Sequence, residues 1–238
     1  SSEIEDAQYP CKIKQCVKCG HVYEDVSNEL SEKLTDIYSF GHAFASTPPS
    51  DNNWGFERAK SFLDKMNYSE YSSAIEIGCA DGYILRFLEE HGYTKLIGVE
   101  PSLSKSKKVG NIEFIKAFAN RNTNLVKVDL IFANAVFEHI EDINSVLQFV
   151  KNNLKVSGEI FFAVPNAEAE LESGDPALFI HEHVHYYTNN SINFLLASNG
   201  FKPKSIVQEQ DAIYVTAALD ANAIIPRHPV HLYSNYLD

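Results

Sequence analysis

The chain has 238 residues, 45% of them hydrophobic, which is enough for a sizeable buried core and excludes a disordered protein. Its formal net charge of -12 would repel the phosphates of nucleic acid and an anionic membrane surface, and Lys105, Lys107 and Lys108 form its one dense basic cluster. No apolar run reaches the ~18 residues that span a bilayer, and the first residues lack the layout of a secretory signal. We therefore expect a cytoplasmic protein that binds neither nucleic acid nor membrane.

Residues 1–50 carry no sustained hydrophobic period and are predicted to be a separate N-terminal segment. It closes with the turn formers Ser46-Thr47-Pro48-Pro49-Ser50-Asp51-Asn52-Asn53, which predict a domain boundary. In Cys16-Val17-Lys18-Cys19-Gly20, the spacing of Cys16 and Cys19 lets both thiolates face one zinc ion, and Cys11 and His21 are candidate further ligands. Two interpretations stay open: a zinc site, and reduced thiols in a loose segment.

Helix-like and strand-like segments alternate beyond this boundary. The predicted elements are a helix over 54–67, a strand over 74–77, a helix over 82–91, strands over 95–100, 112–118 and 129–135, a helix over 140–154, a strand over 158–164, a helix capped at 188–191, and closing strands over 206–207 and 212–219. The alternation predicts an α/β fold over residues 51–219, with a doubly wound, seven-stranded, mostly parallel sheet. Residues 220–238 are predicted to form a C-terminal tail.

The first predicted strand runs into Glu76-Ile77-Gly78-Cys79-Ala80-Asp81-Gly82, and a helix follows at once. The backbone must turn tightly here and exposes its amides to a ligand. Glu100 closes the second strand, where a carboxylate can accept both hydroxyls of a ribose. Together these features predict a cofactor that contains adenosine. A turn that binds pyrophosphate would read Gly-x-Gly-x-x-Gly, whereas here Ala80 separates the glycines and an acid precedes them, which suits a cationic sulfonium better.

These residues resemble the motifs of class I S-adenosylmethionine (SAM) dependent methyltransferases, over roughly residues 55–219. The glycine turn is similar to that family's first motif, Glu100 to its ribose-binding acid, and Asp129–Ile140 to its fourth-strand motif, which ends in Glu-His beside the methyl group. The resemblance implies a Rossmann-like fold. It also implies that SAM is bound by Glu76, Gly78, Cys79, Ala80, Asp81, Gly82, Glu100, Pro101, Phe118, Ala119, Asn134 and Ala135, with Phe118 and Ala119 beside the adenine.

A polar segment, Phe179-Ile180-His181-Glu182-His183-Val184-His185-Tyr186-Tyr187-Thr188, follows the fifth predicted strand. Histidine titrates near neutrality, so the cluster can supply a general base as an acceptor atom is methylated. Two alternatives stay open. One is an inert lid held by hydrogen bonds, and the other is a metal site, for which His-x-His spacing on an extended chain is suited.

This segment is similar to one in the methyltransferases of deoxysugar and surface-polysaccharide biosynthesis, which carry a zinc-binding head before the SAM domain. The resemblance implies that His183 is the base, with Glu182 beside it and His139 as the alternative base. It also places Tyr38 over the active site. Sugar C-methyltransferases of that group have a tyrosine where this chain has Ile180. We therefore expect O-methylation of a sugar or another small polar acceptor, with C-methylation as the alternative.

The N-terminal segment resembles only the second half of that group's zinc head, over Cys16–His21, so zinc is a candidate second cofactor. Two rival functions remain. An NAD-dependent oxidoreductase is disfavoured by the missing third glycine of its fingerprint. A non-catalytic protein that kept the fold as a scaffold is disfavoured because both acids, Glu76 and Glu100, are present.

Overall fold

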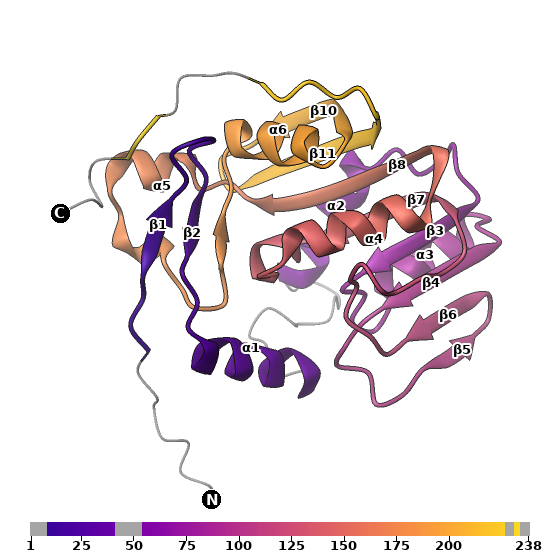
Figure 1. Cartoon of the computed structure of the whole chain (residues 1–238). Helices are drawn as coiled ribbons and strands as arrows, with labels where there is room; N and C mark the ends of the chain where they lie inside the picture. The colour runs from indigo at the N-terminus through magenta and orange to yellow at the C-terminus, as the bar shows by residue number, and fades with distance from the viewer. Residues whose placement is uncertain (1–8, 41–53, 227–230, 234–238) are drawn as a thin grey trace, which may run out of the picture.

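A computed structural model describes residues 9–40, 54–226 and 231–233 of the chain. They form a large eight-stranded sheet flanked by helices and a small three-stranded sheet beside it (Figure 1). Within these residues no helix is long and apolar enough to cross a membrane.

The large sheet consists of β3 (Ser73–Ile77), β4 (Lys95–Val99), β5 (Lys107–Val109), β6 (Ile112–Ile115), β7 (Val128–Asn134), β8 (Leu154–Pro165), β10 (Phe201–Gln208) and β11 (Ala212–Leu219). The small sheet consists of β1 (Ile13–Gln15), β2 (Val22–Glu24) and β9 (His185–Tyr186). The helices are α1 (Asn28–Phe40), α2 (Trp54–Lys65), α3 (Tyr83–Glu90), α4 (Ile143–Asn153), α5 (Glu168–Ser173) and α6 (Asn189–Ser198), with short 3-10 helices η1 (Phe137–His139) and η2 (Pro176–Leu178).

The strand order of the large sheet is β10-β11-β8-β7-β3-β4-β6-β5. Strands β6, β4, β3, β7 and β8 are parallel, whereas β5, β11 and β10 pair antiparallel with their neighbours. From β3 the chain moves outward through β4 and β6 and then returns to place β7 on the other side of β3. A sheet of this kind binds ligands where the strand order reverses, at the carboxyl ends of the strands.

The doubly wound, mostly parallel sheet is confirmed, with eight strands instead of the predicted seven. The additional strand is β5, a short segment at the sheet edge whose residues are all exposed. Its sequence, Lys-Lys-Val, has no alternation between apolar and polar residues, because an edge strand with both faces in water needs none. Strand β10 is also longer than predicted. Phe201 is its only buried residue, so most of the strand has no buried apolar pattern by which the sequence could reveal it.

Two apolar layers cover the faces of the sheet. One layer packs Ile75, Ile131 and Ile160 against α4 and α6, and the other packs Ala74 and Phe132 against α2 and α3. The central strand β3 is buried at every position, as expected for a strand with helices on both faces. This packing holds the carboxyl end of β3 rigidly beside those of β4 and β7.

The N-terminal segment contains regular structure that its sequence pattern did not predict: the β1–β2 hairpin and α1. Strand β2 pairs with β9 through Val22 and Tyr186, so the hairpin lies against the segment that precedes α6 (Figure 1). Leu30 and Leu34 of α1 pack against Val184 of the same segment. The boundary predicted near residue 50 lies outside the described residues.

The described end of the C-terminal tail contacts the same hairpin. The Gln15 side chain donates to the His231 carbonyl oxygen at 2.8 Å and accepts from the Tyr233 backbone N–H at 3.0 Å. The Tyr233 ring packs with Val22 and Leu171. Both ends of the described chain therefore meet at the small sheet.

Candidate functional site

A cavity of about 550 Å³ opens at the carboxyl ends of β3, β4 and β7, the position that the strand order predicts for a ligand. Of the residues predicted to bind the cofactor, all except Gly82 line it: Glu76, Gly78, Cys79, Ala80, Asp81, Glu100, Pro101, Phe118, Ala119, Asn134 and Ala135. Gly82 contributes to the shape of the turn instead. It has φ +82° at the start of α3, and a Cβ there would lie 2.6 Å from the Phe114 ring.

The turn between β3 and α3 depends on unusual backbone conformations. Gly78 has φ +72°, and a Cβ on it would lie 2.6 Å from Val136 Cγ2. Ala80 also has a positive φ, 45°. Its N–H donates to Glu100 Oε2 at 3.1 Å, while the Ser102 N–H donates to Glu100 Oε1 at 2.9 Å. Glu100 therefore braces the turn in addition to facing the cavity, a role that its position in the sequence did not reveal.

Glu76 provides a test of whether a cationic ligand fits. Its side chain is buried, and among the described residues Oε2 has no hydrogen-bond partner. Burial raises the pKa of this carboxyl well above its usual value, and the negative charges of Asp81 and Glu100 add to the effect. A buried carboxyl oxygen without a partner at a cavity wall favours a ligand that donates a hydrogen bond and carries positive charge. The ammonium group of SAM meets both requirements, and the sulfonium adds a second positive charge.

A second group of side chains surrounds His139 in η1. Its Nδ1 lies 2.6 Å from the Glu182 carbonyl oxygen and 2.9 Å from Tyr38 Oη. Because a carbonyl oxygen can only accept, Nδ1 carries the hydrogen and Nε2 keeps a lone pair. Burial lowers the pKa of His139 to about 4, so the ring is neutral at pH 7. A neutral, oriented imidazole at a cavity wall can accept a proton.

Glu138 and His183 lie beside this imidazole. Glu138 Oε1 is 3.7 Å from His139 Nε2, and burial raises the pKa of Glu138 to about 8. The His183 ring packs edge-on against His139 with a centroid distance of 4.8 Å, and burial lowers the pKa of His183. One ligand atom from each of the three lies within 4.8 Å of the others, an arrangement that could hold a metal ion. Among the described residues that line the cavity, His139 and Tyr38 are present, whereas His183 and Glu182 are not.

Comparison with known proteins decides the family. Residues 39–206 match the model of a family described as a methyltransferase domain, which is well over half of the chain. The chain belongs to this methyltransferase-domain family. No curated protein matches it significantly in sequence.

Solved structures share the fold of this methyltransferase. A SAM-dependent methyltransferase from Mesorhizobium loti is 13% identical with a TM-score of 0.53, covering 67% of this chain and 96% of its own. The 1,6-didemethyltoxoflavin-N1-methyltransferase of Burkholderia thailandensis, solved with its substrate and S-adenosylhomocysteine (SAH), is 10% identical with a TM-score of 0.58, covering 88% and 99%. A mitomycin 7-O-methyltransferase is 11% identical with a TM-score of 0.55, covering 68% and 53%. The predicted enzyme class and the predicted cofactor, SAM, are confirmed.

The methyltransferase also has cavity residues that sequence reasoning did not single out. Arg58 of α2 lines the cavity, together with Ser31, Thr35, Glu141 and Asp142. For Glu138, which lies beside His139, the sequence offered one signal: the Glu-His motif places an acid directly before the histidine. Nothing in the local pattern of α1 or α2 marked Ser31, Thr35 or Arg58, since their place in the site depends on how those helices pack.

The three N-terminal cysteines of the methyltransferase occupy two separate places. Cys16 and Cys19 lie in the turn of the β1–β2 hairpin, where the Gly20 N–H donates to the Cys16 carbonyl oxygen at 2.8 Å. Cys11 lies at the opposite, open end of the hairpin. His21 Nε2 contacts His185 Nδ1 at 3.0 Å. The hairpin thus keeps Cys11 away from the other two cysteines.

Proposed function

We propose that this methyltransferase transfers a methyl group from SAM to a hydroxyl oxygen of a small polar acceptor, a sugar or nucleotide-linked sugar of the kind used as a polysaccharide precursor. Methylation at a sugar carbon is the second candidate. The observation that carries the proposal is the neutral, oriented imidazole of His139 at the wall of the cavity that Glu76 and Glu100 share.

The residues at the carboxyl end of β3 would hold the cofactor, which supplies an electrophilic methyl group on a sulfonium. The unpaired Oε2 of Glu76 would accept from its ammonium group. The free lone pairs of Glu100 would accept from the ribose hydroxyls, since each oxygen of that carboxylate already accepts one backbone N–H. Phe118, whose side chain is half exposed at the cavity, offers a flat surface for the adenine.

His139 is the residue we assign as the base. Its Nε2 would take the proton of the acceptor hydroxyl as the new bond forms, while the Glu182 carbonyl and Tyr38 hold the ring in place. Positioned bases of this kind contribute about 100-fold or more to rate. His183, which packs behind His139, is the alternative base.

Polar residues contribute to the cavity wall, among them Ser31, Thr35 and Arg58. Such a mixture of donors and acceptors suits a polyol, and the guanidinium suits the phosphates of a nucleotide-linked sugar. A small polar acceptor is therefore favoured over an extended apolar one.

The cofactor assignment is tested by calorimetric titration with SAH and, separately, with NAD. We expect saturable binding of SAH and none of NAD. Glu100→Ala should weaken SAH binding by at least about tenfold, through loss of a charged hydrogen-bond acceptor. Glu90→Ala, an exposed glutamate at the end of α3, is the matched control and should bind like the wild type. Binding of NAD alone would overturn the proposal, and binding of neither ligand would favour a scaffold.

The base is tested by SAH release from SAM over a panel of nucleoside diphosphate hexoses and their deoxy forms. We expect His139→Ala to keep its affinity for SAH and to lose about 100-fold or more in turnover. His91→Ala, an exposed histidine outside the cavity, is the control. If His139→Ala turns over normally and His183→Ala does not, the base is His183. Turnover with none of the sugars, together with turnover of other acceptors, would refute the proposed substrate class.

A further inference from the structure

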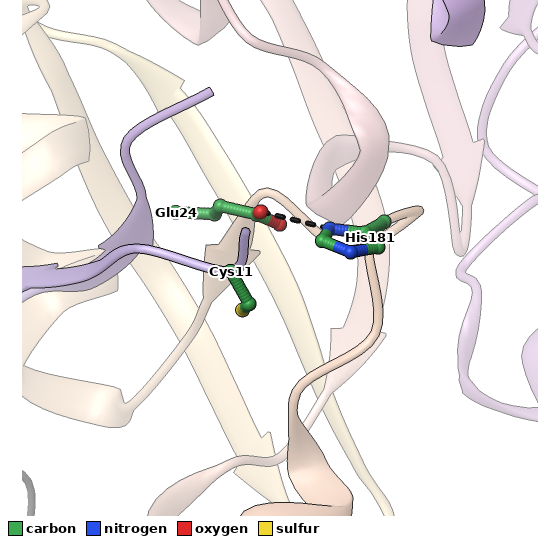
Figure 2. A group of neighbouring side chains, drawn as sticks. All are labelled: Cys11, Glu24 and His181. Carbon is green, nitrogen blue, oxygen red and sulfur yellow. Dashed lines mark hydrogen bonds and ion pairs between the residues drawn. The ribbon is translucent and has the colours of Figure 1, made fainter. Parts of the chain in front are cut away.

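Three potential ligands meet at the open end of the N-terminal hairpin, away from the methyl-transfer cavity. Cys11 precedes β1, Glu24 ends β2 and His181 lies in the loop before β9 (Figure 2). Each side chain offers one ligand atom, and these atoms lie within 4.8 Å of one another. Cys11 and Glu24 belong to the two ends of one hairpin, whereas His181 lies 157 residues beyond Glu24, so the fold brings this combination together.

One carboxylate oxygen of Glu24 has a partner in this group and the other has none among the described residues. Its side chain is 0% exposed, and Oε1 lies 2.8 Å from His181 Nδ1. Among the described residues, Oε2 has no hydrogen-bond partner. A buried carboxylate oxygen without a partner costs roughly 1–3 kcal/mol or more. A cation at this point would remove that cost.

His181 is oriented as a metal ligand would be. Its Nε2 lies 3.1 Å from the Tyr9 carbonyl oxygen, which can only accept, so Nε2 carries a hydrogen. Its Nδ1 points at Glu24, as Figure 2 shows. Metal-bound histidines almost always donate their second ring N–H to a carbonyl or carboxylate in this way, which fixes the tautomer and the ring orientation.

We propose that Cys11, Glu24 and His181 bind one zinc ion. Thiolate, imidazole and carboxylate are the groups that zinc takes, at about 2.0–2.3 Å, which places tetrahedral ligand atoms roughly 3.5 Å apart. The present separations, none above 4.8 Å, lie on both sides of this value: His181 Nδ1 and Glu24 Oε1, 2.8 Å apart, would have to separate slightly, and the exposed Cys11 side chain can move to adjust its own distance. Water fills the fourth position. On binding, the Cys11 thiol releases a proton to the solvent, and so does the hydrogen bond between His181 Nδ1 and Glu24 Oε1, which holds one hydrogen.

Zinc at this point would fasten the hairpin to the segment that supports the methyl-transfer site. The Glu24 N–H donates to the Val184 carbonyl oxygen at 3.0 Å, and the Val184 N–H donates to the Glu138 carbonyl oxygen at 2.8 Å. His181, which would hold the ion, directly precedes Glu182, whose carbonyl oxygen orients His139. The role of the ion is structural, and it is independent of the proposed acceptor.

Cobalt(II) titration tests the site, because a thiolate–cobalt bond gives a near-ultraviolet charge-transfer band. The full chain is used with Cys16→Ser and Cys19→Ser, so that a band from the hairpin turn is excluded. We expect one cobalt ion per chain, displaced by zinc, with the band abolished by Cys11→Ser. His181→Asn should weaken binding at least about tenfold through loss of one ligand, whereas His91→Asn, an exposed histidine elsewhere, should not change it.

Glu24→Gln is a second variant that keeps the shape of the side chain and should also weaken cobalt binding, with circular dichroism to confirm folding. The proposal is overturned if the Cys16→Ser, Cys19→Ser chain gives no thiolate–cobalt band. It is equally overturned if the band survives Cys11→Ser. In either case the three side chains form only a hydrogen-bonded histidine–glutamate pair beside a thiol.

Discussion

Burial sets the protonation of individual side chains around the methyl-transfer cavity. It lowers the pKa of His139 to about 4 and raises that of Glu138 to about 8, because the low-dielectric interior disfavours the charged form of each. At pH 7 the two neighbours are therefore both neutral. The imidazole of His139 is therefore unprotonated throughout the physiological pH range.

The pH dependence of kcat/KM should reflect this state of His139. We expect the rate to stay level from pH 8 down to about pH 5 and to fall only as the imidazole is protonated near pH 4. An exposed histidine would instead give a fall near pH 6.5. The measurement is the pH–rate profile at saturating SAM, with His91→Ala as a control of unchanged shape. A midpoint at pH 6.5 or above would contradict the assignment.

At the scale of secondary-structure elements, the turn between β3 and α3 requires particular residues, because Gly78 has a positive φ and lies close to Val136. Gly78→Ala places a methyl group at positive φ and 2.6 Å from Val136 Cγ2. We expect a loss of about 2–4 kcal/mol in unfolding free energy, from backbone strain plus overpacking, and weaker SAH binding. Urea unfolding and SAH titration measure the two effects.

Gly92→Ala is the matched control for that turn. Gly92 also has a positive φ, +89°, but a Cβ on it meets nothing within 4 Å. It should therefore lose only the ~1 kcal/mol of strain and bind SAH normally. Equal losses in the two variants would show that contact with Val136 contributes nothing.

The glycine turn could be predicted from sequence because its chemistry is local. An acid, two glycines and a strand-to-helix change fall within seven residues, from Glu76 to Gly82. Helix α1 was missed although Leu30, Leu34 and Ile37 have helical spacing, because one short apolar stripe without neighbours is a weak pattern. The contact between Tyr38 and His139 spans 101 residues, and only the docking of α1 creates it. Local periodicity carries no information about such a contact.

At the scale of the whole molecule, the small sheet ties both ends of the described chain to the segment before α6. Strand β9 of that segment pairs with β2, and the C-terminal Tyr233 packs on the same side of the hairpin. The Val184 N–H of this segment donates to the carbonyl oxygen of Glu138, whose carboxyl is buried and becomes exposed when the protein unfolds. The unfolding free energy of the protein and the protonation state of Glu138 are thus linked.

Glu138→Gln measures this link. In the unfolded chain the carboxyl has its ordinary pKa of 4.5, whereas in the folded protein the pKa is about 8, so the folded state holds an extra proton between these values. Stability then falls as the pH rises through this window, by up to about 1.4 kcal/mol per pH unit from this one group. His139 acts in the opposite direction, but only between about pH 4 and pH 6.5, because above that its ring is neutral in both states.

Between pH 6.5 and pH 8, the titration of Glu138 therefore changes the unfolding free energy without a contribution from His139. Urea unfolding in the absence of SAM should show the wild type losing stability over this range and the variant losing less, because an amide does not titrate. Glu76, which is buried in both proteins, contributes equally to both and cancels in the difference. Glu90→Gln, at an exposed position, should follow the wild type. Parallel curves for the wild type and Glu138→Gln would mean that Glu138 is already ionised in the folded protein at pH 6.5, and a buried charge of that kind would require a cation beside it.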